Sequence, residues 1–552
     1  MMRPVLRARA LRRKTRQIIR GYRLLRKGPD PHLVSRLNCE LTLLDLEVQE
    51  HKLPAFLLGP EVRRAEIAAR QLFLSRLAGS RLNSEILRSI ADREHKVAAP
   101  VPGTWITKLE QFGLRVEVRK CQGLFALFVL TMLARGIARF LMILTAQAEE
   151  TTHLQTGCRY AQFCDLAAKN LPARTARPRY DIVSWYLGWD GRVEHLCEVR
   201  HTVRGQRNRD LDGVAVMYSR RNLPSLAGVR TRVRYAMWGA RAIAWCSWQA
   251  LRGQWLCAVL LEDAALAQQV HCLQPGSLAA EYLFNCSGII RRPFWTYAAE
   301  RMGSTVTLYF YSAGLRSCFN GTRPHYETGL QSMTWARILV FSTHQQEYLA
   351  AATDARVPVT LVPPINFSDV DIDLPATERR CIAVFDVSPA RMSYRAPLAP
   401  DDDYRVVSVG IRFLEDIYAS VLSHGYTMMW KRKRPAHAIY QTGYVRFAQA
   451  FSQRPGVIEV PPDVAAARVI RNCVAVISMP FTSTSVLGDL AGVPSVFYDP
   501  TGAVPDIDPA ALGVRVVSGT RALDRWLDAL PDLSAVAGSR PLAHTTTLAF
   551  GE

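Results

Sequence analysis

The chain of 552 residues lacks several patterns that would place it quickly in a functional class. Its twelve cysteines form no CxxC pair and have no histidines at matching spacing, which argues against a zinc site and for reduced thiols in a cytosolic compartment. No DxD-type metal motif follows an expected strand, because Asp401-Asp402-Asp403 comes after Pro400 in an expected loop. No module with aromatic residues interleaved among Lys and Arg is recognisable, so a nucleic-acid-binding protein is not favoured.

Acidic residues are missing from the start of the chain, where eleven of the first 27 residues are Lys or Arg. The segment lacks the continuous apolar core that a secretory signal peptide needs, so none is expected, while an organellar transit peptide stays open. Residues 3–27 interleave these cations with Leu and Ile, a pattern typical of a basic amphipathic helix on an anionic surface. A solvated tail is the alternative. We expect residues 1–150 to form a basic, mostly helical, membrane-associating region.

An uninterrupted apolar span is also lacking, although residues 123–146 come close to one. Arg135 and Arg139 lie near the centre of this stretch, and each would be costly in hydrocarbon. The pattern favours a buried or interfacial helix with one cationic stripe over a transmembrane helix, which stays open. Net charge is the chain's strongest bias: 69 basic minus 48 acidic residues gives +21, which suits a polyanion, an anionic membrane or an acidic nucleotide substrate.

Beyond residue 172, strand-like runs alternate with helical ones, which predicts βαβ units and mainly parallel sheets. We expect one Rossmann-like domain over residues 172–368 and a second over residues 378–552, with a hinge around Pro363-Pro364 and residues 369–375. In the first domain the expected strands are 180–185, 214–217, 255–261, 306–311, 338–341 and 359–362, and the expected helices are 278–284 and 294–302.

The chain is organised around residues 474–502, VAVISMPFTSTSVLGDLAGVPSVFYDPTG, which predict strand, loop, helix and strand. Hydroxyl side chains gather where the helix begins, and a helix N-terminus of this kind attracts anions. In a doubly wound sheet such a loop lies at the carboxyl ends of the strands, where ligands bind. An ordinary capped βαβ unit without a ligand is the alternative. The candidate phosphate-binding residues are Thr482, Ser483, Thr484 and Ser485.

The Pro480-Phe481-Thr482-Ser483 sequence in this frame resembles the polysaccharide-biosynthesis PFTS-motif proteins, which are glycosyltransferases of bacterial surface-polysaccharide clusters. Four other stretches carry the same resemblance: SWYLGWDGRVEHLCEVRHTVRG (184–205), RRPFWTYAAERMGSTVTLYFYS (291–312), YETGLQSMTWARILVFS (326–342) and IAVFDVSPAR (382–391). The resemblance covers about residues 180–502. It implies a GT-B-like α/β fold of two Rossmann-like domains.

The resemblance implies a glycosyltransferase that uses a CMP-, UDP- or GDP-linked sugar, requires no cofactor or metal, and extends a capsule or O-antigen chain on a lipid-linked acceptor. The C-terminal domain would hold the donor and the preceding domain the acceptor. The expected location is the cytoplasmic side of the inner membrane, as a peripheral protein on an anionic surface. Two alternatives remain: a nucleotide-sugar epimerase of similar build, and a non-catalytic scaffold of polysaccharide assembly.

A run of four cations, KRKR at 431–434, follows an expected strand at 426–430. Cations at a strand end in the same sheet as the hydroxyl loop would neutralise a diphosphate or phosphodiester. We therefore add Lys431, Lys433 and Arg434 to the donor site. A solvated basic turn is the alternative.

Sugar transfer with inversion needs a group that takes a proton from the acceptor hydroxyl. Asp190, Glu198 and His201 are the candidates, because they crowd into the segment WDGRVEHLCEVRH. Glu198 and Arg200 form an ordinary ion pair in the alternative interpretation. The candidate acceptor-binding residues are Arg200, Arg291, Arg292 and Trp295.

Overall fold

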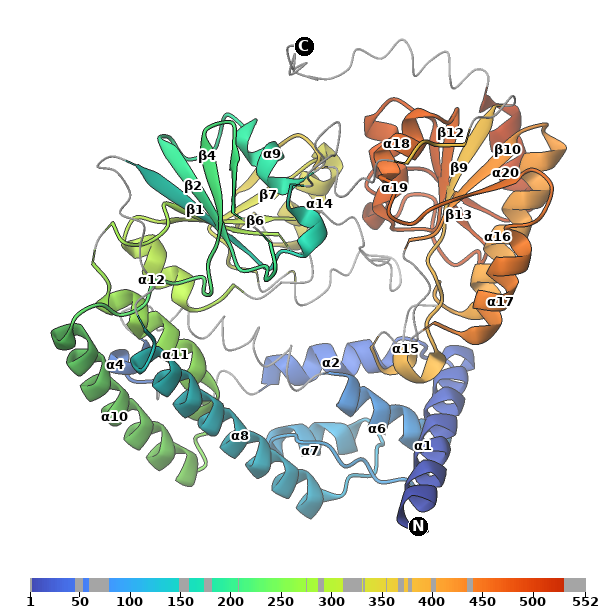
Figure 1. Cartoon of the computed structure of the whole chain (residues 1–552). Helices are drawn as coiled ribbons and strands as arrows, with labels where there is room; N and C mark the ends of the chain where they lie inside the picture. Colours follow the sequence, from blue (N-terminus) through green and yellow to red (C-terminus); the bar gives the residue numbers. More distant parts are fainter. Residues whose placement is uncertain are drawn as a thin grey trace.

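The computed structural model contains a layer of helices and two separate sheets, which are labelled in Figure 1. It describes residues 2–530 except 45–52, 59–78, 148–157, 173–180, 207, 275, 286–291, 311–329, 331–332, 354, 366–371, 376–379, 399–403 and 434–439. Arg291 and Arg434 therefore lie outside the described residues, as do Asp401, Asp402 and Asp403.

The N-terminal region is helical, as expected. Its helices are α1 (Met2–Lys27), α2 (Leu33–Leu44), α4 (Ala55–Leu58), α6 (Ser80–Ala91), α7 (Gly103–Gln111) and α8 (Val118–Leu144). The second half of α1 packs on α6 and buries Ile18, Tyr22 and Leu25. Gly21 permits this contact, because a Cβ there would lie 1.7 Å from the carbonyl oxygen of Leu87. That half of α1 is therefore part of a protein core rather than a helix lying free on a surface.

Helix α8 lies along two helices of the next domain, α10 (Val229–Leu251) and α11 (Leu256–Cys272). Gly136 faces Leu261 so closely that a Cβ would clash with it. The two arginines in the apolar run share one acid, since Arg135 and Arg139 each lie 3.2 Å from a carboxylate oxygen of Glu262. Among the described helices, α8 alone is long and apolar enough to cross a membrane, judged by length and composition only.

The first domain is built on an eight-stranded sheet with the order β3-β4-β2-β1-β5-β6-β7-β8. All neighbouring strands are parallel except β3 and β4. The strands are β1 (Arg159–Cys164), β2 (Leu196–His201), β3 (Arg209–Leu211), β4 (Val214–Tyr218), β5 (Glu281–Phe284), β6 (Thr305–Tyr309), β7 (Arg337–Val340) and β8 (Val359–Leu361). The remaining helices are α9 (Ile182–Leu187), α12 (Trp295–Arg301) and α14 (Thr343–Ala352).

Several expectations for this domain are wrong. β1 is the first strand of this sheet in the sequence and lies near its centre. The domain therefore begins before the expected boundary at residue 172. The expected strand at 180–185 is helix α9, which Asp181 caps by accepting the backbone N–H of Ser184 at 2.8 Å. The expected strand at 255–261 is the start of α11, and the expected helix at 278–284 contains β5. These segments are almost wholly buried, and a short buried apolar run has no periodicity that separates helix from strand.

The second domain contains a six-stranded sheet, entirely parallel, with the order β11-β10-β9-β12-β13-β14. Its strands are β9 (Cys381–Phe385), β10 (Thr427–Lys431), β11 (Val457–Val460), β12 (Ala475–Ser478), β13 (Ser495–Asp499) and β14 (Val516–Ser518). Its helices are α15 (Met392–Leu398), α16 (Val407–Ser423), α17 (Thr442–Phe451), α18 (Ala466–Arg471), α19 (Ser483–Leu490) and α20 (Thr520–Asp528).

This strand order is that of a doubly wound dinucleotide-type fold, in which the chain moves outward from a central strand, returns, and moves outward on the other side. Helices and strands alternate along the sequence as the hydrophobic pattern predicted. The α/β class, the two Rossmann-like domains and the basic helical region before them are therefore confirmed, in the expected GT-B-like layout.

Candidate active site

The strand order of the second sheet reverses between β9 and β12, and the carboxyl ends of these strands flank a switch point at which ligands of such folds bind. Pairing places three residues in one row across the sheet, because Phe385 of β9 is opposite both Lys431 of β10 and Ser478 of β12. The residues that follow each strand therefore emerge at the same edge. They are Asp386, the basic segment after Lys431, and the PFTS loop.

Asp386 was not predicted from the sequence. Its carboxyl group is buried directly after the central strand and accepts a hydrogen bond from the hydroxyl of Tyr444. Burial raises the pKa of Asp386 to about 6, although the hydrogen bond from Tyr444 and the nearby Arg432 and Lys431 oppose the shift. The signal was present in the sequence FDVSPAR, where an acid follows a fully apolar strand.

The PFTS loop turns sharply between β12 and α19. Phe481 has a positive φ of 61°, which is uncommon for a residue with a side chain, and its ring is buried. This turn makes Thr482 the N-cap residue of α19. The hydroxyl of Thr482 donates to the carbonyl oxygen of Met479 at 2.8 Å instead of accepting a helix N–H.

The four hydroxyls predicted to bind phosphate fall into two groups. Ser485 is fully buried, lies 2.5 Å from the hydroxyl of Ser478, and donates to the carbonyl oxygen of Val496 at 2.9 Å. Together with Thr482 it holds the loop and α19 to the sheet. Ser483 and Thr484 are half-buried in the first turn of α19. They are the members of the set whose position suits contact with a ligand.

The basic segment after β10 is less uniform than its sequence suggests. Lys431 is buried and its Nζ donates to the carbonyl oxygen of Pro462 at 2.9 Å. Arg432 forms an ion pair with Glu459 and lies over the ring of Trp430. Lys433 is exposed. Of the predicted donor-site cations that the structure describes, Lys433 is thus the one exposed to solvent, while Lys431 supplies charge from within the sheet edge.

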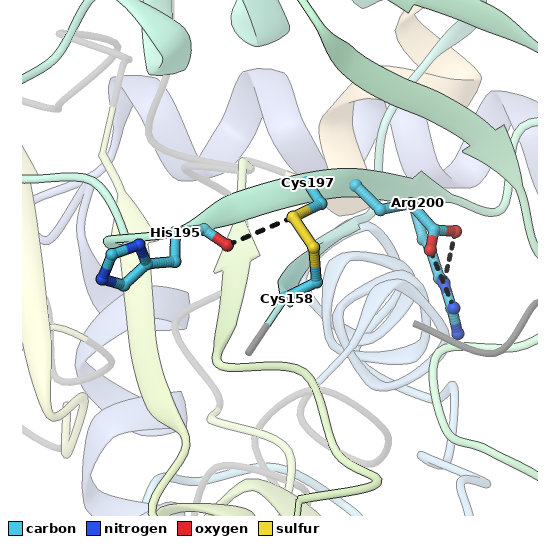
Figure 2. Close-up of a disulfide and its surroundings, with 5 residues drawn as sticks. Cys158, His195, Cys197 and Arg200 are labelled. Carbon is cyan, nitrogen blue, oxygen red and sulfur yellow. Dashed lines mark hydrogen bonds and ion pairs between the residues drawn. A yellow bond between two sulfur atoms is a disulfide. The ribbon is translucent and has the colours of Figure 1, made fainter. Parts of the chain in front are cut away.

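Figure 2 shows Arg200 and the carboxylate with which it pairs, Glu198. The guanidinium donates to both carboxylate oxygens at 2.7 and 3.0 Å, and it lies 4.1 Å from the centre of the Tyr160 ring. Glu198 and Arg200 lie on the same face of β2, as the alternation predicted. This geometry corresponds to the ion-pair alternative, and a carboxylate with both oxygens occupied is poorly prepared to accept a proton.

His201 and Asp190 lie in contrasting surroundings. His201 ends β2, is buried, and accepts the backbone N–H of Val203 at its Nδ1. Burial lowers the pKa of His201, so the ring is neutral and carries its proton on Nε2. Asp190 lies in an exposed turn after α9. Asp190 is the candidate base that remains open to an incoming hydroxyl.

A disulfide joins Cys158, just before β1, to Cys197 of β2 (Figure 2). The expectation that the thiols are reduced is therefore wrong for this pair. The parallel pairing of β1 with β2 brings the two cysteines together across 39 residues of sequence. Because β1 was not predicted, the sequence did not indicate this disulfide. In the part of the chain that the structure describes, seven further buried cysteines are not disulfide-bonded: Cys121, Cys164, Cys246, Cys257, Cys272, Cys381 and Cys473.

Arg292, a predicted acceptor-binding residue, is buried inside the first domain rather than exposed on an open wall. Its side chain is 2% exposed and donates to the hydroxyl of Thr296, to the carbonyl oxygen of Thr334 and to the carboxylate of Glu300. The guanidinium also lies 4.1 Å from the centre of the Tyr297 ring. These contacts join α12 to the segment before β7, so Arg292 has a structural role.

A cavity of about 680 Å³, which the sequence did not predict, lies at the carboxyl ends of β2 and β4. Trp295, a predicted acceptor residue, lines it. Four arginines line it as well: Arg139, Arg204, Arg220 and Arg221. In the part of the chain that the structure describes, no three His, Cys, Asp or Glu residues are grouped so that they could hold a metal ion.

The model of the polysaccharide biosynthesis PFTS motif protein family matches residues 240–527, which is over half of the chain. The chain belongs to this family. The match runs from α10 of the first domain to α20 of the second, and it includes the switch point, Asp386 and the PFTS loop.

No curated protein sequence matches this chain significantly. Among solved structures, the chain is similar to a sucrose-phosphate synthase from Thermosynechococcus elongatus, with 12% identity, a TM-score of 0.35, and coverage of 69% of this chain and 92% of the other. For HepE of Anabaena in complex with UDP and glucose the values are 10%, 0.35, 69% and 95%. For the lipopolysaccharide outer core galactosyltransferase WaaB they are 10%, 0.30, 68% and 94%. At these scores the likenesses carry no argument about what this chain binds.

Proposed function

We propose that this protein is a glycosyltransferase that moves a sugar from a nucleotide-sugar donor onto a growing bacterial surface polysaccharide. The observation that supports the proposal best is the row of Phe385, Lys431 and Ser478, which brings Asp386 and the PFTS loop to the switch point of a doubly wound sheet. Membership of a polysaccharide-biosynthesis family supports a saccharide as the substrate.

The donor diphosphate or phosphodiester lies against the first turn of α19 in this proposal. The free N–H groups at a helix N-terminus and the hydroxyl of Ser483 donate to its oxygens, and Lys433 neutralises part of its charge. As the bond to the sugar breaks, negative charge grows on the leaving phosphate, and groups fixed in place beforehand stabilise it without reorganising. Asp386 becomes neutral only as pH falls below about 6, and a protonated carboxyl group no longer repels phosphate.

The acceptor hydroxyl approaches from the first domain. Asp190 takes its proton in our proposal, since it is exposed, whereas Glu198 is held by Arg200. A CMP-, UDP- or GDP-linked donor, a lipid-linked acceptor of a capsule or O-antigen, and a peripheral position on the cytoplasmic side of the inner membrane complete the proposal. The net charge of +21 supports attachment to an anionic membrane surface.

Isothermal titration against CMP, UDP and GDP, each free and sugar-linked, tests the donor site. We expect one nucleotide class to bind, and Lys433→Ala to weaken its affinity. Arg521→Ala, which removes an exposed charge from α20 of the same domain, serves as the matched control and should leave affinity unchanged. If no nucleotide binds, the glycosyltransferase proposal is wrong and the non-catalytic scaffold is favoured. Conversion of a sugar nucleotide to its epimer without an acceptor would instead show the epimerase.

A further inference from the structure

We propose that the arginine-lined cavity of the first domain binds the phosphate or diphosphate group of a lipid, and that the apolar surface of α8 and α10 beside it contacts the lipid chains. This inference rests on the proposed function, for which it supplies the acceptor site. It adds a specific location and a ligand class: an anionic phosphoester attached to a long hydrocarbon.

The cavity is strongly cationic. Its lining includes four arginines and, among the described residues, no Asp or Glu. Arg204 follows β2 and Arg220 follows β4, and both are exposed and make no hydrogen bond or ion pair with a described residue. Arg139 shares Glu262 with Arg135, so one acid faces two guanidinium groups there. Several guanidinium groups around one cavity suit a phosphate or diphosphate, which Arg binds through paired N–H donors.

The position of the cavity also suits an anion. Thr202 and Arg204 emerge from β2 and the Arg220-Arg221 pair from β4, at the edge of a parallel sheet where ligands bind. The C-terminal carbonyl groups of α8 would disfavour an anion nearby, but Arg232 donates to the carbonyl oxygen of Ala146 at 2.9 Å. That contact offsets the negative end of the helix.

Apolar side chains continue outward from the rim of the cavity. Met142 lines the cavity and is 56% exposed, and its neighbour Leu141 is exposed too. Further along α8, Leu127 and Leu130 are exposed. The three leucines 127, 130 and 141 repeat at intervals of three and eleven residues, so they share one side of the helix.

Helix α10 packs beside α8 and also has exposed apolar side chains (Figure 1). The two helices approach closely at Gly239, where a Cβ would lie 1.9 Å from the ring of Phe140. The exposed apolar residues of α10 are Val229, Val233, Met237, Trp248 and Leu251.

Charge indicates what covers this surface. Neither α8 nor α10 contains an acidic residue, while the two helices together carry Arg119, Lys120, Arg135, Arg139, Arg230, Arg232, Arg234 and Arg241. Exposed apolar side chains interspersed with cations and without acids are the composition of helices that lie in the interface of an anionic bilayer. A lipid phosphate held in the cavity would place its hydrocarbon next to this surface.

Binding of a lipid diphosphate tests the inference without any nucleotide sugar. The probe is farnesyl diphosphate in phosphatidylcholine vesicles, measured by co-flotation, with inorganic pyrophosphate measured by isothermal titration in a second arm. We expect the doubly substituted Arg204→Ala/Arg220→Ala variant to lose about ten-fold or more in affinity for both probes, because charged hydrogen bonds are lost. The variant Arg521→Ala/Arg525→Ala removes two exposed charges from α20 of the second domain and should change either affinity less than two-fold.

The apolar contribution is tested with Leu127→Gln/Leu130→Gln, which should weaken flotation with farnesyl diphosphate vesicles and leave pyrophosphate binding unchanged. Circular dichroism confirms that each variant is folded. Equal loss in the cavity variant and its control would overturn the cavity site. If pyrophosphate binds as tightly as the lipid and the leucine variant floats normally, the ligand is a soluble phosphate and the lipid assignment is wrong. Because nucleotide binding in the second domain is measured separately, failure here is distinguishable from failure of the proposed transferase activity.

Discussion

The hydroxyl of Tyr444 donates a hydrogen bond to Asp386 at the carboxyl end of the central strand β9, and both side chains are buried. The pair lies at the switch point of the sheet, so the protonation state of Asp386 affects both the stability of the fold and the charge at that edge of the sheet.

The first prediction concerns pH. The pKa of Asp386 is raised by burial from 3.8 to about 6 in the folded state, so the folded protein binds more protons than the unfolded chain between these values. The stabilisation is complete below about pH 4 and is lost as pH rises through about 6, by on the order of 3 kcal/mol. Asp386→Asn should remove this contribution to the pH dependence of unfolding, measured by urea titration from pH 4 to pH 7. An unchanged slope in the variant would show that another group is responsible.

The second prediction separates two serines of the PFTS loop. Ser485→Ala removes a buried hydroxyl that bonds to Val496 and should lower the free energy of unfolding by about 1–3 kcal/mol without changing nucleotide affinity in the folded protein. Ser483→Ala should do the reverse: it removes one hydrogen bond to a charged group, about 1.5–3 kcal/mol of binding. Melting temperature and nucleotide affinity are measured on both variants. A lower melting temperature with normal affinity for Ser483→Ala would leave the loop as structure only.

The third prediction concerns the proton acceptor. Asp190→Asn should abolish sugar transfer and spare both folding and nucleotide affinity, because Asp190 is exposed and lies in the other domain. Glu198→Gln should weaken the contact with Arg200 and cost about 1–3 kcal/mol of stability. Transfer rates under saturating donor are compared with thermal unfolding for both variants. Full activity of Asp190→Asn would exclude it as the base.

The fourth prediction concerns the disulfide. Replacing both Cys158 and Cys197 by Ser should destabilise the first domain by at most about 4 kcal/mol in the chain-entropy account, because the bond closes a loop with a sequence separation of 39 residues. The melting temperature is measured for both proteins with and without reductant. Reductant should lower it for the natural sequence and leave the double variant unaffected. Equal responses would mean that the pair is not bonded in solution.

The fifth prediction concerns Arg292. Arg292→Lys cannot maintain bonds to Thr296, Thr334 and Glu300 at once, so we expect a loss of about 3 kcal/mol in stability and an unchanged KM for the acceptor. Arg192→Lys, at an exposed position of the same domain, is the control for the substitution itself. A raised KM in a stably folded Arg292→Lys protein would restore Arg292 to the acceptor site.

The strands of the second domain expected at 426–430 and within 474–502 are confirmed as β10, β12 and β13. Its strands and helices alternate in short segments ended by Gly or Pro, and the hydrophobic period changes with each, as at Val474 to Gly492. Secondary structure in the first domain was harder to predict because its central segments are apolar on all sides. Helix α11 buries nearly every residue, and a helix buried all round shows no period that distinguishes it from a strand.

The site was less predictable than the fold. Residue types and strand ends located the PFTS loop and the Glu198–Arg200 pair correctly. The different roles of similar residues became clear only from their hydrogen bonds. Ser483 and Ser485 look alike in sequence, yet only Ser485 is buried against β13. Asp386 and the arginine-lined cavity depend on strand order and on contacts between distant segments, which local patterns do not contain.

The N-terminal helices also contact the other end of the molecule. α15, which follows β9, packs on both α1 and α6, and Asn83 donates to the carbonyl oxygen of Pro397 at 2.8 Å across 314 residues of sequence. At a synthesis rate of about 5–20 residues per second, the ribosome needs roughly 15 to 60 s to make the intervening chain. During that interval α1 and α6 expose the surface that α15 later covers, so the N-terminal helices complete their packing only after residue 398 has been synthesised.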